Sequence, residues 1–227
     1  MTEWMNYHLE KLNEVHRENA EGGDPNRIKI QHDLGKLTVR ERISMLFDPD
    51  SFQELGSVVK DIRPTTVRGT ITDNSAGDGV VMGFGEIDGR QTAVYGTDFA
   101  VMSGSVGNQG AWKIADFVKL AGRMRVPLVA IFDTAGLRVS ITEGDVGGAG
   151  FANILRNHAL NSGVIPQIGV VSGPCIGMMA YAASLCNFLV MNSKTAFLWH
   201  GGEKESADAG SSNRNMITSG QCDMEVD

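Results

Sequence analysis

The sequence predicts an α/β protein in which helices cover a largely parallel sheet. Three observations indicate this class. Short runs rich in β-branched residues alternate with segments of helical periodicity. Glycine-marked turns follow the strand-like runs, and from residue 79 onward a strand–strand–helix order repeats. Ligands of such sheets bind at the carboxyl ends of the strands, so the turns located there are the first candidates for a site.

Composition excludes several classes of function. The 227 residues suffice for one sizeable domain, and the hydrophobic (42%) and charged (21%) fractions are those of an ordinary globular protein. A net charge of −7 gives no electrostatic case for nucleic acid or an anionic membrane. We expect no transmembrane span and no signal peptide, because apolar runs of ~18 residues are missing. The three cysteines, Cys175, Cys186 and Cys222, fit a reducing cytoplasm and no metal site.

Residues 1–60 predict an N-terminal helical arm. Residues 2–20 have the apolar spacing of a surface helix, which a glycine-rich turn ends. Thr38 and Glu41 have the spacing of a capping box that opens a short helix to about Phe47. From its composition, we interpret this charged region as a solvated arm without chemistry.

Residues 61–227 form the second predicted unit, the α/β domain. Asp88-Gly89 is a hairpin signal between its first two strands. The expected elements follow in order: strands 80–87 and 91–97, a loop at 98–109, a helix at 110–124, a strand at 127–132, an acidic loop at 143–150, a helix at 151–161, a strand at 165–171, a helix at 177–183, a strand ending at 192 and a strand at 195–199.

Two turns in this unit are the candidate site. Gly173-Pro174 is expected to break one strand, and Gly177 then opens a helix of small, unbranched residues. Glycine at such a turn lets the chain approach a ligand closely. The free N–H groups at the helix start suit an oxyanion, such as the enolate of a thioester. The second turn covers residues 133–138.

Four segments carry a resemblance to a known family. Residues 27–52, 78–99, 162–177 (SGVIPQIGVVSGPCIG) and 218–220 are similar, in this order, to motifs of the carboxyltransferase subunit (β-chain) of biotin-dependent acyl-CoA carboxylases of the propionyl-CoA carboxylase type. They correspond to its N-terminal half. The resemblance implies a crotonase/ClpP-like spiral of ββα units.

The resemblance also implies a reaction. A carboxyl group passes between carboxybiotin, held on a partner carrier protein, and the α-carbon of a coenzyme A thioester of the propionyl- or acetyl-CoA type. Oxyanion stabilisation drives this transfer, and no Ser, Cys or His nucleophile is needed. An acyl-CoA decarboxylase or transcarboxylase subunit of the same family stays open, as does a non-catalytic acyl-CoA-binding assembly subunit.

The family's motifs assign the catalytic groups by position. Its paired glycines fall on Gly177 and Met178, and its Asp-Ser-Gly-Gly-Ala-Arg turn falls on residues 133–138, so that main-chain amides of Gly177, Met178, Ala135 and Gly136 are the expected catalytic groups. Met178 places a thioether where the family has glycine, and we expect it to crowd the pocket. Ala135 also replaces a glycine, which argues against a positive φ there.

The remaining candidates are expected near the coenzyme A thioester. They are Arg138, Gly104, Ser105 and Cys175. Arg138 either braces its turn or approaches coenzyme A, and the loop of Gly104 and Ser105 lies close to the substrate site in the family. Cys175 is either small packing beside the ligand or, in combination with His158 or His200, a thiol nucleophile.

The resemblance implies partners as well. Members of the family carry two such domains, and their active site forms between the first domain of one subunit and the second domain of another. We therefore expect a C-terminal carboxyltransferase domain, a biotin carboxyl carrier and a biotin carboxylase subunit as partners in a homo- or hetero-oligomer.

Overall fold

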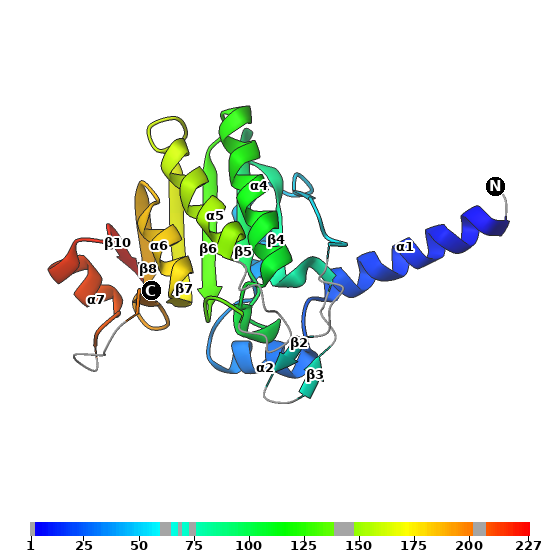
Figure 1. Ribbon diagram of the computed structural model, residues 1–227, viewed down its shortest axis with the longest axis horizontal. Coiled ribbons are helices and arrows are strands. Elements are labelled where there is room, and N and C mark those ends of the chain that lie inside the picture. Colours follow the sequence, from blue (N-terminus) through cyan, green and yellow to red (C-terminus); the bar gives the residue numbers. More distant parts are fainter. Residues whose placement is uncertain (1–2, 60–64, 68–69, 73–75, 139–147, 202–207) are drawn as a thin grey trace.

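A mixed sheet of eight strands organises the chain in a computed structural model that describes residues 3–59, 65–67, 70–72, 76–138, 148–201 and 208–227 (Figure 1). Its strands are β1 (Gln53–Glu54), β4 (Val80–Ile87), β5 (Arg90–Thr97), β6 (Leu128–Thr134), β7 (Gln167–Ile176), β8 (Phe188–Asn192), β9 (Phe197–Trp199) and β10 (Met224–Val226). The order is β1-β4-β5-β6-β7-β8-β10, and β9 pairs with β7. The pairs from β5 to β10 are parallel, which confirms the α/β class. A separate small sheet joins β2 (Thr65–Val67) and β3 (Thr70–Thr72).

Helices cover both faces of the sheet. One face carries α4 (Asn108–Met124), α5 (Gly148–Asn161) and α6 (Met178–Ser184), which stand in front of the strands in Figure 1. The other face carries α3 (Val39–Leu46). Successive side chains of β6 point to opposite faces of the sheet, as this arrangement requires. Phe132 packs in the hydrophobic core beneath α4 and α5, and Ile131 packs in a second hydrophobic cluster beneath α3. The short α7 (Ser212–Arg214) precedes a π-turn at Asn215–Ser219.

The hairpin between β4 and β5 is confirmed. Ile87 pairs with Arg90, so the turn consists of Asp88 and Gly89 alone. Both residues have positive φ (50° and 70°), which is the geometry that a two-residue turn needs to match the twist of its strands.

The prediction that Gly173-Pro174 breaks the strand is wrong. Strand β7 continues to Ile176 and changes partner at this point. Val171 is its last partner for β8, and Pro174 is its first partner for β9. Proline has no N–H to donate, and the change of partner is where the ladder can accommodate that loss. The single strand β7 thus pairs with β8 along its first part and with β9 along its last part.

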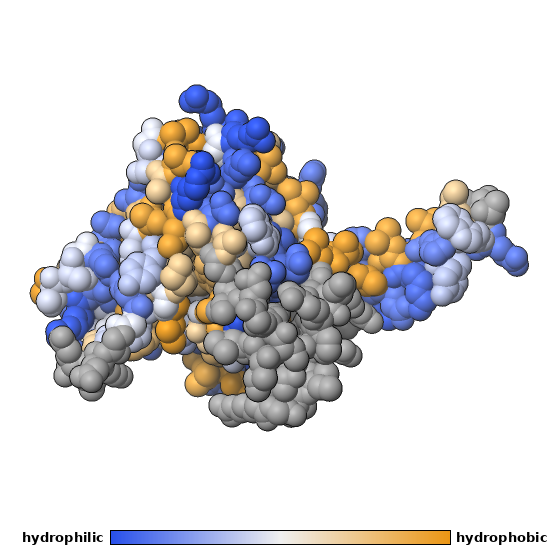
Figure 2. Space-filling view, viewed as in Figure 1, coloured by the Kyte–Doolittle hydropathy of each residue, from blue (hydrophilic) through white to orange (hydrophobic). Residues whose placement is uncertain are grey.

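The N-terminal helices were partly predicted. The long α1 (Glu3–Glu21) projects from the body (Figure 1) and exposes apolar side chains along its length (Figure 2). The next helix, α2 (Pro25–Asp33), was not predicted, although Asp24 caps it by accepting from the Asn26 N–H and Pro25 occupies its first turn. The capping box of Thr38 and Glu41 is present at the start of α3 as predicted.

The interpretation of this region as a solvated arm is wrong for α3. Val39, Ile43 and Phe47 are buried against the sheet. The proposed boundary between residues 60 and 61 lies outside the described residues and stays a prediction, as does most of the acidic loop predicted at 143–150.

Candidate active site

The two predicted turns lie side by side at the carboxyl ends of β6 and β7. Thr134 pairs with Cys175 in the parallel ladder. Gly136, with a φ of 90°, passes so close to β7 that an added Cβ would lie 2.6 Å from the carbonyl oxygen of Ile176. Ile176 directly precedes Gly177, so the two bends touch through their main chains. Only glycine fits position 136, both for its φ and for this contact.

The positive φ falls on Gly136 rather than on Ala135. Ala135 therefore does not need the left-handed conformation that disfavours alanine, because the turn places it one residue later, on Gly136. The Ala135 amide donates to the carbonyl of Ser103 at 2.9 Å, and the Gly136 amide donates to Thr134 Oγ1 at 2.9 Å. Both amides that the sequence predicted as oxyanion donors at this bend are already used within the protein.

The bend at Gly177 offers more freedom. Its φ of 63° and ψ of −128° are open to glycine alone, and its amide donates to the carbonyl of Trp199 at 2.7 Å. The amide of Met178, the first residue of α6, has no hydrogen-bond acceptor among the described residues. Apart from its two chain neighbours, no atom of the described residues lies within 4 Å of a Cβ added at Gly177. The half-buried Met178 side chain packs against the core cluster. One unused donor therefore stands beside open space.

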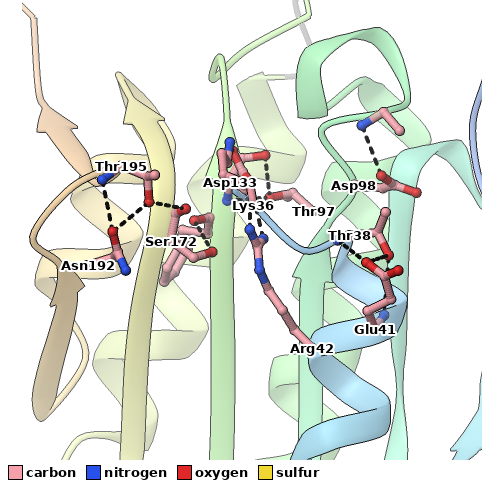
Figure 3. A network of polar contacts seen from close by, with 12 residues as sticks. Lys36, Thr38, Glu41, Arg42, Thr97, Asp98, Asp133, Ser172, Asn192 and Thr195 are labelled. Carbon is pink, nitrogen blue, oxygen red and sulfur yellow. Dashed lines mark hydrogen bonds and ion pairs between the residues drawn. The ribbon is translucent and has the colours of Figure 1, made fainter. Parts of the chain in front are cut away.

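A buried carboxylate anchors the first bend from behind (Figure 3). Asp133 has no exposed surface. Its Oδ1 accepts from Lys36 Nζ at 2.8 Å, and its Oδ2 accepts from both terminal nitrogens of Arg42 at 3.2 Å. Burial lowers the pKa of Lys36, and the charge of Asp133 opposes that shift. Sequence reasoning missed both cations, although a buried Asp at the end of an apolar strand calls for a charged partner.

Comparison with known proteins decides the family. Residues 30–213 match the carboxyl transferase domain. The chain belongs to this family. It is 38% identical over 178 residues to the propionyl-CoA carboxylase beta chain of Cereibacter sphaeroides, an alignment that covers 78% of this chain and 34% of that protein. The chain thus spans about a third of the length of the curated relatives it matches.

Solved structures agree with the predicted crotonase-like fold. The transcarboxylase 12S structure with methylmalonyl-coenzyme A bound superposes with a TM-score of 0.88 at 32% identity, covering 100% of this chain and 46% of that one. A subunit of a Pseudomonas malonate decarboxylase hetero-tetramer superposes with a TM-score of 0.69 at 28% identity, covering 84% of this chain and 76% of that one. The fold of a carboxyl transferase domain is therefore confirmed.

In this carboxyl transferase domain, the loop of Gly104 and Ser105 lies behind the first bend. Thr134 Oγ1 donates to the Gly104 carbonyl at 2.6 Å, and a Cβ on Gly104 would lie 2.1 Å from the carbonyl oxygen of Asp133. The Ser105 hydroxyl donates to the carbonyl of Met102 at 2.7 Å. These contacts make the loop a support for the bend.

Arg138 takes the bracing role of the two that the sequence left open. Its guanidinium donates to the Asp78 carboxylate and, at 2.7 Å, to the Ser105 carbonyl. Asp78 also accepts from the Gly110 amide at the start of α4 at 2.7 Å. Arg138 is only 4% exposed. A guanidinium so placed joins three segments and has no face left for coenzyme A.

Cys175 is packing rather than a nucleophile or a ligand contact. Its side chain lies fully buried in the core, and burial raises the pKa of the thiol well above its ordinary value, with Cys186 and Asp133 adding to the shift. His158 bonds to Tyr95 and Gln167, and the His200 ring lies 2.9 Å from Ser184 Oγ. The thiol–histidine alternative therefore has no support in the geometry.

Metal and membrane chemistry receive no support from the described residues. Within these ranges, no group of three or more His, Cys, Asp or Glu side chains is placed to hold a metal ion. In the same part of the chain, no helix combines the length and apolarity that crossing a bilayer requires.

Proposed function

We propose that the chain is the N-terminal carboxyltransferase component of a biotin-dependent acyl-CoA carboxylase. In this proposal, it transfers a carboxyl group between carboxybiotin on a partner carrier protein and the α-carbon of a propionyl- or acetyl-CoA type thioester. The observation that carries the proposal is the convergence of two bends, at Gly136 and at Gly177–Met178, in a carboxyl transferase domain. Both bends belong to motifs that place the thioester in the family.

The chemistry follows from charge. Carboxyl transfer at the α-carbon passes through an enolate, which places negative charge on the thioester oxygen. A fixed main-chain donor stabilises that charge without reorganising, and one such donor is typically worth about 2.7–4 kcal/mol. Of the four amides predicted as donors, that of Met178 is the one that has no acceptor among the described residues. The amides of Ala135, Gly136 and Gly177 hold the shape of the site through Ser103, Thr134 and Trp199.

Biotin fits this site as a partner-bound group. When bound, carboxybiotin supplies the activated carboxyl group. The open space beside Gly177 and the main-chain amide of Met178 suit a neutral ureido ring or a thioester. We place no side chain of this chain in the transfer itself.

The proposal requires other chains. We expect a C-terminal carboxyltransferase domain, a biotin carboxyl carrier and a biotin carboxylase subunit as partners in an oligomer. The malonate decarboxylase structure supports the expectation that the two carboxyltransferase domains are separate chains, because its comparable chain belongs to a hetero-tetramer. We also predict a cytoplasmic location, which the three free cysteines favour.

Similarity to that decarboxylase favours one alternative. An enolate of the same kind arises when a carboxyl group leaves the α-carbon of a thioester such as malonyl-CoA, so a decarboxylase or transcarboxylase subunit needs the same donor. A non-catalytic acyl-CoA-binding subunit is the remaining candidate.

Calorimetric titration with acetyl-, propionyl- and malonyl-CoA tests binding by the chain. We expect saturable binding of at least one thioester. The second assay adds a C-terminal-domain partner and the biotin carrier, and measures carboxylation of propionyl-CoA and decarboxylation of malonyl-CoA. Turnover only with the partner supports the proposal, and the direction of turnover distinguishes carboxylase from decarboxylase. Binding without turnover in any combination would leave the assembly subunit, and no binding at all would reject both.

A further inference from the structure

The ion pairs on Asp133 join the N-terminal segment to the candidate active site. Lys36 and Arg42 lie 97 and 91 positions before Asp133 in the chain, yet each binds one of its carboxylate oxygens. Lys36 stands between α2 and α3, and Arg42 comes from α3 itself. Figure 3 shows both cations reaching the end of β6 from this segment, and Figure 1 shows α2 at the end to which the arrow of β6 points.

Asp133 has little freedom to move. A fully buried carboxylate is stable only when its charge is paired and hydrogen-bonded. Its main chain is fixed as well, because the Asp133 amide donates to Thr97 Oγ1 at 3.0 Å and its carbonyl accepts from the same hydroxyl at 3.2 Å. Both ends of the residue are thereby tied to the sheet and to the N-terminal segment.

The ion pair between Lys36 and Asp133 also packs closely against Gly173 of β7. An added Cβ on Gly173 would lie 2.0 Å from Asp133 Oδ1 and 2.6 Å from Lys36 Nζ. Gly173 therefore provides the room in which Lys36 and Asp133 meet. The pair sits between β6 and β7, the two strands whose ends carry the bends.

A short path leads from Asp133 to the second bend. The next residue, Thr134, accepts from the Gly136 amide at 2.9 Å, and Gly136 lies against the carbonyl of Ile176. A shift of Asp133 would therefore move Gly136 relative to Gly177 and the Met178 donor.

We propose that Lys36 and Arg42 are positioning residues for the reaction: by holding Asp133, they set the distance between the bend at Gly136 and the donor at Met178. This inference rests on the proposed function. Neither cation touches the substrate in it. Their contribution is the geometry of the site, which decides how well a charged enolate fits compared with a neutral thioester.

The test compares Lys36→Met and Arg42→Met with Arg40→Met. Arg40 is a matched control, because it lies on α3 and forms a similar two-bond ion pair with Glu54, at 2.8 and 3.1 Å, away from Asp133. Arg42→Lys keeps the charge but loses the planar fork, and serves if a methionine variant fails to fold.

Two readouts separate positioning from stability. The first is hydrogen exchange of the hydrogen-bonded amides of Ala135, Gly136 and Arg138, which we expect to rise at least tenfold in Lys36→Met and Arg42→Met relative to β6 residues 129–132. The second is the affinity for a thioester analogue that carries a fixed negative charge at the enolate oxygen, divided by the affinity for propionyl-CoA. We expect this ratio to fall roughly tenfold or more, as for a misplaced catalytic group, and partial rescue in Arg42→Lys.

The control decides the interpretation. Unchanged exchange at the bend, or an equal change in Arg40→Met, would overturn the inference. If the wild-type chain binds neither ligand, the proposed function fails, and the exchange measurement alone then decides whether Lys36 and Arg42 hold the bend.

Discussion

The two bends of the site are built in different ways. The bend at Gly136 is fixed by side chains and neighbours on every side: Asp133 with its two cations, Thr134 with its hydroxyl, and the carbonyl of Ile176. The bend at Gly177 is held by main-chain hydrogen bonds: its amide donates to Trp199, and its carbonyl accepts from Ala180 and Tyr181 at the start of α6. A Cβ added at Gly177 would meet no described atom beyond its chain neighbours within 4 Å. At the packed bend, the amides of Ala135 and Gly136 donate within the protein, whereas at the open bend the Met178 amide has no acceptor among the described residues. Shape and binding are thus divided between two adjacent turns.

Gly136→Ala should give the largest effect on stability. The added methyl group meets a main-chain oxygen at 2.6 Å, which cannot rotate away, and φ is 90°. We expect a loss of about 4 kcal/mol, roughly 2 from the backbone conformation and 2 from the overlap. Urea unfolding followed by circular dichroism measures it. A loss below about 1 kcal/mol would show that the bends separate easily and that this bend is not the packed one.

The sequence predicted what local rules determine. The hairpin at Asp88-Gly89 and the capping box of Thr38 and Glu41 each depend on residues within four positions, and both are present. Helix α2 was missed although Asp24 and Pro25 carried its local start signal. The crotonase-like fold followed from the order of family motifs.

What the sequence could not supply depends on distant segments. The acceptors of the Ala135 and Gly177 amides are Ser103, in a distant loop, and Trp199, at the end of β9, so spacing could not show which donors were free. Pro174 reads locally as a break, yet β9 provides a second partner for the strand. The cations on Asp133 come from a region whose composition looked solvated.

Acid pH should lower the free energy of unfolding through His158, which binds Gln167 at the amino end of β7, opposite the bends. The Gln167 amide nitrogen donates to the His158 carbonyl at 3.0 Å, so its oxygen faces His158 Nδ1, and Nε2 is left to accept from Tyr95. His158 is therefore held neutral, and burial lowers its pKa to about 4. The unfolded chain binds this proton near pH 6.5, so stability is fully present above pH 6.5 and falls by about 3 kcal/mol as pH approaches 4.

His158→Gln is the control for this prediction. It removes the titrating group, so urea midpoints should depend less on pH between 6.5 and 4 than in the wild type, whatever the absolute stability. Equal slopes would show that another group causes the acid loss. Hydrogen exchange at pH 5 would sharpen the comparison further, because the bend at Gly136 should stay protected while amides around Gln167 begin to open.

Gly177→Ala should have the smallest effect on stability and a clear effect on binding. Its methyl group meets no atom of the described residues beyond the chain neighbours within 4 Å, so the backbone conformation is what opposes it, at about 2 kcal/mol. Gly163→Ala is the matched control, because Gly163 also has positive φ (74°) and open space, but lies in the turn between α5 and β7 at the other end of the strand.

In the proposed function, the thioester binds the Met178 amide, next to the position of the methyl group that Gly177→Ala adds. We therefore expect acyl-CoA affinity in calorimetry to fall at least tenfold, or about 1.4 kcal/mol, in Gly177→Ala. Gly163→Ala should bind as the wild type does. Equal affinities in all three proteins would place the thioester elsewhere and would leave the open bend without its proposed role.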